Sequence, residues 1–105
     1  MAAAGGGVLN PLDPQPAPLP AEGDVWAEII AELPEGHILR PLAIERRAQG
    51  IERYGVPLQR GNGRDHLVDA LQEALDLMCH LRAADGPGQA VARWLAVAIA
   101  EDVAL

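Results

Sequence analysis

Apolar residues recur every three or four positions along most of the chain, which is the spacing of one face of a helix. Clusters of glycine and proline at 34–36, 55–63 and 86–88 interrupt this pattern and divide it into four segments. We therefore predict four helices, over 25–33, 41–54, 65–84 and 89–104. Asp24 is the expected N-cap of the first, and Pro41 suits the first turn of the second. No stretch alternates in the manner of a strand, so the predicted fold is all-α, a small helical bundle.

The first 23 residues have a different composition from the rest. They hold five of the nine prolines and a run of three glycines at 5–7, and such a segment has little to bury. We predict a flexible, disordered tail over 1–23 and one helical domain over 24–105. An arm that binds a partner or straps an oligomer is the alternative. The start, MAAAGGGVL, lacks the basic and apolar regions of a signal peptide, so we expect a cytoplasmic protein.

The last predicted helix is apolar on nearly every side. Between residues 90 and 100 its only charge is Arg93, so it must be covered on nearly every side. It is short for a membrane span and Arg93 interrupts it, so we expect no membrane association. About 80 ordered residues cannot easily bury such a helix within one chain. We therefore expect it in a subunit interface, with a central core helix of a monomer as the alternative.

The charge balance excludes several classes of function. There are 15 acidic residues against 8 basic ones, a net charge of -7, and every basic residue is arginine. Nucleic-acid binding needs a basic face, so no nucleic-acid partner is expected. Without lysine, Schiff-base and P-loop chemistry are excluded. The single cysteine, Cys79, excludes a disulfide framework or a cysteine-based zinc site within one chain.

The third predicted helix carries a row of acidic side chains opposite its apolar face. The steps along this row are four, four, three and four residues, so neighbouring side chains lie together on the helix surface. Like charges at these spacings repel, whereas Mg²⁺ or Mn²⁺ would be bound by several carboxylate oxygens. The second helix offers a similar row, and the two rows would face each other if these helices pack antiparallel. Two solvated helix faces are the alternative. The rows are Asp65, Asp69, Glu73, Asp76 and His80 on the third helix, and Glu45, Gln49 and Glu52 on the second.

Several short motifs follow one another between Glu45 and Arg82, over 38 of the 105 residues. They are Glu45-Arg-Arg-Ala-Gln-Gly-Ile-Glu-Arg-Tyr54-Gly55, Leu58, Asn62-Gly63-Arg64-Asp65, Asp69-Ala-Leu-Gln-Glu73-Ala-Leu-Asp76 and His80-Leu81. In this order they resemble the small MazG-like proteins of bacteriophages. The resemblance implies an enzyme, an all-α nucleoside triphosphate pyrophosphatase that is dimeric or tetrameric and uses Mg²⁺ or Mn²⁺. A narrower resemblance to the MazZ group implies conversion of dGTP or GTP to the monophosphate, for phage synthesis of 2-aminoadenine nucleotides.

The resemblance also implies the residues of the site. The family holds its metal with a Glu-x-x-Asp pair and a Glu-Glu-x-x-Glu motif on neighbouring helices. Glu73-x-x-Asp76 matches the pair, and Glu45 and Asp69 are the implied additional ligands or their hydrogen-bond acceptors, so Glu73, Asp76 and Glu45 form the implied catalytic set. The second motif is incomplete around Glu45. Alternatively, Gln72-Glu73-x-x-Asp76 takes its place, and the second pair comes from Glu101-Asp102 or is lost.

Substrate contacts are expected around the glycine turn at 61–63. Arg60 and Arg64 flank Asn62 in this turn and could reach phosphate oxygens in bidentate fashion, or else be solvated or paired with nearby acids. Tyr54 could stack on a base, or pack in the core. Two other functions stay open: a non-catalytic helical interaction module, and a nucleotide sensor that binds without turnover.

Overall fold

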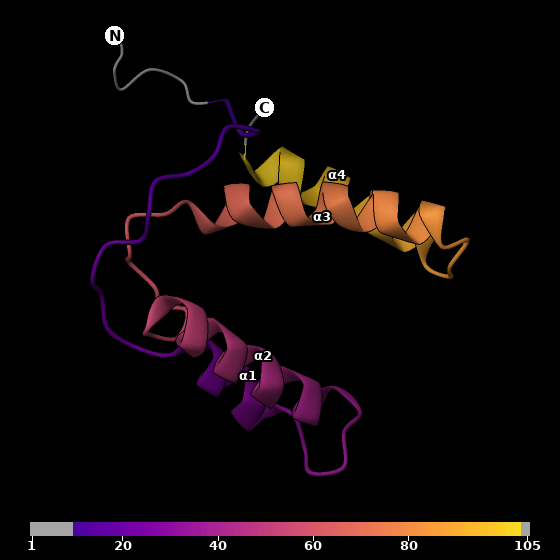
Figure 1. Ribbon diagram of the computed structural model, residues 1–105. Coiled ribbons are helices and arrows are strands. Elements are labelled where there is room, and N and C mark those ends of the chain that lie inside the picture. The colour runs from indigo at the N-terminus through magenta and orange to yellow at the C-terminus, as the bar shows by residue number, and fades with distance from the viewer. Residues whose placement is uncertain (1–9, 104–105) are drawn as a thin grey trace, which may run out of the picture. The chain divides into compact units, whose positions relative to one another are not determined.

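The computed structural model describes residues 10–103, and within this range it contains four helices and no strand (Figure 1). They are α1 (Val25–Glu32), α2 (Leu39–Tyr54), α3 (His66–Ala83) and α4 (Gln89–Val103). The all-α prediction is confirmed, and each predicted helix lies within about two residues of an observed one. The predicted end of the last helix at Ala104 and the first nine residues of the predicted tail lie outside the described residues.

The helix ends follow from local chemistry. Asp24 precedes α1 in an extended conformation and accepts a hydrogen bond from the Ala27 backbone N–H at 2.9 Å, as expected of an N-cap. Asp65 does the same for α3, accepting from Leu67 and Val68 at 3.1 and 3.2 Å. Gly55, at φ 84°, ends α2 in the left-handed conformation that glycine adopts without steric cost.

The chain divides into two compact units. One is continuous, runs from Pro18 to Gly63 and contains α1 and α2. The other contains α3 and α4, together with the described residues before Pro18. We call them the α1–α2 unit and the α3–α4 unit. The division falls between Gly63 and Arg64, inside the helical domain predicted over 24–105, and between Ala17 and Pro18, inside the predicted tail.

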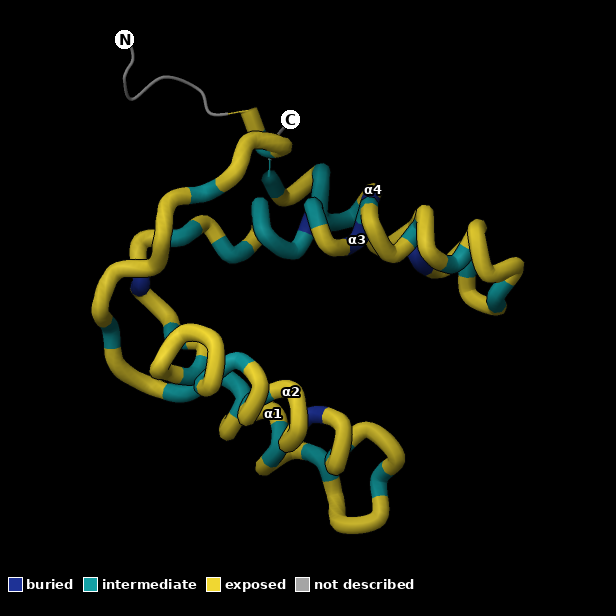
Figure 2. Tube along the Cα trace, in the orientation of Figure 1, coloured by how far each residue is buried: buried dark blue, intermediate teal, exposed yellow. Residues whose placement is uncertain are grey.

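The α3–α4 unit is a helical hairpin closed by small side chains. Among its described residues, the buried ones are Leu71 and Ala74 of α3 and Ala92 and Ala96 of α4 (Figure 2). Because alanine side chains are small, two helix backbones can approach closely where alanines lie between them. The turn between the helices places Asp85 at φ 49°, and the Gly86 N–H bonds to the Leu81 carbonyl at 2.9 Å.

The α1–α2 unit has a smaller apolar core. Ala43 of α2 is its one buried apolar residue among those described. Polar bonds tie its segments together instead. The Val25 N–H donates to the Leu58 carbonyl at 2.9 Å, and Arg47 of α2 donates to the Asp24 carboxylate at 2.8 Å.

Residues 10–17, which we call the strap, run beside α3 in the α3–α4 unit. The Gln72 side chain donates to the backbone oxygens of Pro11 and Asp13 at 2.8 and 3.0 Å. Gln15 donates to the Asp65 carbonyl and accepts from the Asp65 N–H, at 2.7 and 2.8 Å. The flexibility of residues 1–23 stays a prediction, but the strap portion of that segment has defined partners on α3.

Candidate functional site

The predicted site residues are distributed over both units. Arg64, Asp69, Glu73 and Asp76 belong to the α3–α4 unit, and the others, Glu45, Tyr54, Arg60 and Asn62, belong to the α1–α2 unit. The expected facing of acidic rows from α2 and α3 stays a prediction.

Asp69 and Arg64 form a two-armed ion pair at the start of α3. The Arg64 Nη2 lies 2.7 Å from Asp69 Oδ1, and the Arg64 Nε lies 3.0 Å from Oδ2. Gln15 of the strap donates to Asp69 Oδ1 as well, at 2.8 Å. The hydrogen bonds from Arg64, more than any other cause, hold the pKa of the Asp69 carboxyl below its ordinary value. A metal ion at Asp69 would have to replace these bonds.

Glu73 and Asp76 follow on α3 and are both exposed. Neither side chain has a hydrogen bond or ion pair within residues 10–103. Their three-residue spacing places both carboxylates on one side of the helix, where they can bind the same cation. No group of three or more acidic, histidine or cysteine side chains able to hold a metal is present in the described part of the chain. The neighbouring Gln72 is bonded to the strap.

The predicted substrate contacts of the α1–α2 unit have varied surroundings. Arg60 forms a two-armed pair with Glu28 of α1, with Arg60 Nη2 lying 2.7 Å from Glu28 Oε1. These hydrogen bonds lower the pKa of the Glu28 carboxyl. Asn62 is 3% exposed, and its backbone carbonyl accepts a hydrogen bond from the Leu19 N–H at 2.7 Å.

Tyr54 and Glu45, also of the α1–α2 unit, are both exposed. The Arg53 guanidinium lies 5.2 Å from the centre of the Tyr54 ring. Tyr54 therefore does not pack in a core, which was the alternative to base stacking. Glu45 accepts a long hydrogen bond of 3.4 Å from Gln49, one turn away on α2.

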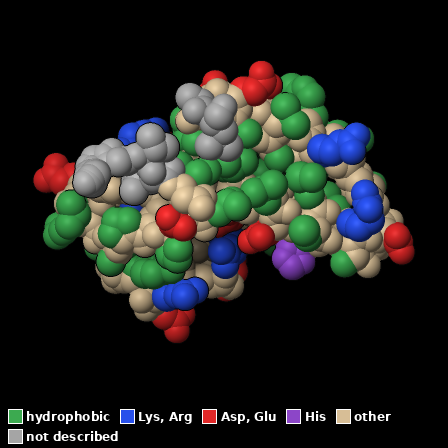
Figure 3. All heavy atoms as spheres, turned by 90° about the horizontal axis from the view of Figure 1, so that it is seen from above, with side chains coloured by type: hydrophobic (Ala, Val, Ile, Leu, Met, Phe, Trp, Pro, Cys, Tyr) green, Lys and Arg blue, Asp and Glu red, His purple; other side chains and the backbone are tan. Residues whose placement is uncertain are grey.

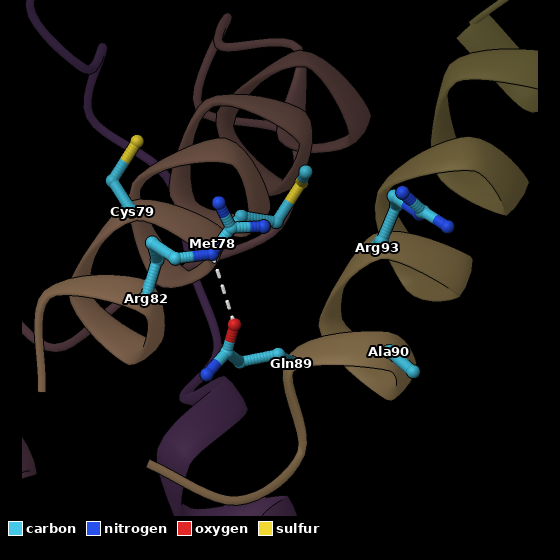
Figure 4. A pocket seen from close by; sticks show the side chains of 6 residues that line it. All are labelled: Met78, Cys79, Arg82, Gln89, Ala90 and Arg93. Atoms are coloured by element: carbon cyan, nitrogen blue, oxygen red, sulfur yellow. Dashed lines mark hydrogen bonds between the residues drawn. The ribbon is translucent and has the colours of Figure 1, made fainter. Parts of the chain in front are cut away.

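The α3–α4 unit also contains a groove that the sequence did not single out. It lies where the end of α3 meets the start of α4, with a volume of about 390 Å³ (Figure 4). Arg82 donates to Gln89 across it at 3.0 Å. Arg82 and Arg93, eleven residues apart in the sequence, were the only signal by which the sequence could have indicated this groove. None of the predicted metal ligands lines it; the lining residues are Met78, Cys79, Arg82, Gln89, Ala90 and Arg93.

A second groove, of about 360 Å³, runs between the strap and the seam of α3 and α4. Its lining is almost entirely apolar, with Leu71 and Leu75 on α3 and Ala96 and Val97 on α4. It offers no carboxylate for a cation. None of the predicted metal ligands lines this groove either, and Glu73 and Asp76 lie on the exposed surface of α3.

No protein-family model, curated protein or solved structure matches this chain. The MazG-like resemblance consequently stays a prediction that rests on the motifs between Glu45 and Arg82. Within residues 10–103, no helix is both long and apolar enough to cross a bilayer.

Proposed function

We propose that the chain is a metal-dependent nucleoside triphosphate pyrophosphohydrolase. It converts a (d)NTP, with (d)GTP as the preferred substrate, into the (d)NMP and pyrophosphate. In the setting that the MazZ-like motifs suggest, the product serves phage synthesis of 2-aminoadenine nucleotides. The proposal includes a cytoplasmic location and assembly as a homodimer or homotetramer.

The observation that carries the proposal is that the Glu73 and Asp76 carboxylates are exposed and have no arginine partner among the described residues. Three other carboxylates, those of Asp24, Glu28 and Asp69, are each paired with an arginine. Glu73 and Asp76 are exposed and make no bond to any described residue, although they lie on one helix side at the spacing of the family's metal pair. Two adjacent negative charges that receive no protein cation are suited to an external one.

Glu73 and Asp76 would hold the Mg²⁺ or Mn²⁺ ion, with Glu45 and Asp69 as further ligands or acceptors. Such an ion supplies neutralisation of the triphosphate charge and a more acidic water for attack on the α-phosphorus. Arg60 and Arg64 would bind phosphate oxygens once they leave their carboxylate partners. The Tyr54 ring, exposed in the structure, is available for stacking on the base.

The direct test is pyrophosphate release from each common NTP and dNTP, with Mg²⁺, Mn²⁺ or EDTA. We expect metal-dependent release that is fastest with guanine nucleotides. Broad release would support hydrolysis without the guanine preference. No release with any nucleotide would exclude the enzyme.

Glu73→Gln tests the metal pair, since it keeps the side-chain size and removes the charge. We expect release to fall by at least 100-fold while far-UV circular dichroism stays unchanged. Glu32→Gln is the matched control, because Glu32 is exposed at the end of α1 and bonds no described residue. Equal activity of the two variants would remove Glu73 from the site.

The second candidate is a non-catalytic interaction module, and the exposed apolar side chains favour it. Val91, Trp94 and Val97 of α4 are among them, and hydrophobic side chains cover much of the face drawn in Figure 3. This candidate predicts no effect of metal and nucleotide on the melting temperature. A nucleotide sensor would show a raised melting temperature without pyrophosphate release.

A further inference from the structure

The two grooves of the α3–α4 unit share one edge. The groove of about 390 Å³ between the end of α3 and the start of α4 contains Arg82 and Arg93, and we call it the arginine groove. The groove of about 360 Å³ beside the strap is lined mostly by leucine, alanine and valine side chains, and we call it the apolar groove. Met78 and Arg93 line both. A ligand that lies across this edge therefore meets positive charge on one side and apolar side chains on the other.

The two arginines of the arginine groove have no carboxylate partner among residues 10–103. Arg82 donates to the neutral side-chain oxygen of Gln89 at 3.0 Å, and Gln89 is itself held by a 3.2 Å bond to the Gly86 carbonyl. Arg93 makes no hydrogen bond or ion pair within the same range. Three other arginines of the chain each bind a carboxylate. Two guanidinium groups that line one groove repel each other, and an anion bound between them removes that repulsion.

The arginine groove also has the geometry to receive a carboxylate. Figure 4 shows that Arg82 comes from α3 and Arg93 from α4, with the Met78 side chain extending from α3 toward α4. A guanidinium donates two parallel hydrogen bonds to a carboxylate, which makes such contacts strong and directional. Helix α4 begins in this groove at Gln89, and the positive end of its dipole adds to the attraction for an anion.

The apolar groove has the length of an alkyl chain. It extends along α4 from Arg93 to Ala100 and along α3 from Met78 to Leu71. Seven residues of helix are about 10 Å long, which suits a chain of medium length. Val97, which lines the groove, is 53% exposed. Contact of such apolar side chains with water is unfavourable, and an alkyl chain in the groove would replace that water.

We propose that the two grooves together bind the anion of a medium-chain fatty acid such as decanoate. Its carboxylate accepts hydrogen bonds from Arg82 and Arg93, and its alkyl chain lies in the apolar groove over the seam of α3 and α4. A phosphate would use the arginine groove alone, and an uncharged apolar molecule would leave both guanidinium groups unmatched. The inference does not depend on the proposed enzymatic function, because Glu73 and Asp76 line neither groove.

The first test is calorimetric titration of the full chain with fatty-acid anions, without metal and below the concentration at which micelles form. We expect one decanoate per chain, with affinity that rises about two- to fourfold for each methylene from hexanoate to decanoate. Decan-1-ol should bind at least about 10-fold more weakly than decanoate, because it lacks the charge that the arginines bind. Absence of decanoate binding, or equal binding of decan-1-ol, would overturn the proposal.

Variants of each groove have matched controls. Arg93→Gln should weaken decanoate binding at least about 10-fold, whereas Arg46→Gln on α2 should not change it. Val97→Asp should weaken binding strongly, because it places a negative charge in the apolar groove. Val91→Asp is its control, since Val91 is 66% exposed on the same helix and lines neither groove. Circular dichroism checks that each variant is folded. Equal affinities within either pair of folded variants would overturn the proposal.

Competition experiments identify other occupants. GTP and pyrophosphate should not displace decanoate, because neither has an alkyl chain for the apolar groove. Displacement by either one at a similar concentration would assign the arginines to a phosphate ligand and overturn the proposal. Binding to phosphatidylglycerol vesicles without binding of dissolved decanoate would assign the grooves to a lipid surface, which would also overturn it. Pyrophosphate release is measured separately, so loss of the enzymatic proposal would leave the decanoate result unaffected.

Discussion

The two units hold their helices together by different means. In the α3–α4 unit, leucine and alanine side chains are buried between the helices, with Leu71 and Ala92 at 3% and 2% exposure. In the α1–α2 unit Ala43 is the one buried apolar residue among those described, and arginine–carboxylate pairs connect the segments. Apolar contact persists at every pH and salt concentration, whereas exposed ion pairs weaken in acid and in salt. We therefore expect the units to respond differently to the same perturbation.

The largest effect should come from the core of the α3–α4 unit. Leu71→Ala removes a side chain that is buried against α4, and such a change costs about 2–5 kcal/mol of unfolding free energy. Leu67→Ala is the control on the same helix, because Leu67 is 47% exposed, and it should cost less than half as much. Urea unfolding followed by circular dichroism measures both. Equal losses would show that the α3–α4 core is not the main source of stability.

An intermediate effect is expected at Asp69, where the α3–α4 unit also uses charge. Its pKa lies below the ordinary 3.8 because Arg64 stabilises the carboxylate, so the stabilisation is present above that pH. It is lost as pH falls through the lowered pKa. Asp69→Asn should cost about 1–2 kcal/mol at pH 7 and progressively less below about pH 4. Unfolding free energies of both proteins from pH 7 to pH 2, without metal, measure this difference.

A difference between wild type and Asp69→Asn that stays constant down to pH 2 would contradict the assignment. Asp76→Asn is the control on the same helix, since Asp76 bonds no described residue. We expect it to cost much less unfolding free energy at pH 7 than Asp69→Asn.

The smallest effect should come from the exposed pair of the α1–α2 unit. Arg60→Gln removes the pair with Glu28, and both side chains are about half or more exposed to solvent. We expect a small fall in melting temperature at low salt that disappears near 1 M salt, where the screening length is about 3 Å. Thermal unfolding at two salt concentrations measures it. A fall in melting temperature as large as that caused by Leu71→Ala would show that the two units are not stabilised by different means.

The sequence predicted the helices well because their signals are local. Asp24 and Asp65 bond N–H groups two or three residues away, and Gly55 ends α2 through its own conformation. The strap could not be predicted in this way. Its bonds join residues 48 to 61 positions apart through the side chains of Gln15, Arg64 and Gln72. No local pattern encodes those contacts.

The candidate site shows the same limit. The sequence predicted that Glu73 and Asp76 lie on one side of a helix, because helical periodicity fixes which positions share a side. The sequence did not predict that Arg64 binds Asp69, because several acidic residues lie near Arg64 and nothing in the sequence distinguishes among them. Arg60 and Glu28 are 32 positions apart in the sequence, and helical periodicity does not predict a contact over that separation.

The order of the units along the chain has a consequence for synthesis on the ribosome. The α1–α2 unit is one continuous segment, so all its parts are available once Gly63 has left the exit tunnel. The strap is made before the α1–α2 unit but bonds Asp65, Asp69 and Gln72, so these bonds can form only after the start of α3 has been made. The hairpin closes only after α4 has followed. Because chains grow at about 5–20 residues per second, the α1–α2 unit can fold seconds before the α3–α4 unit is complete.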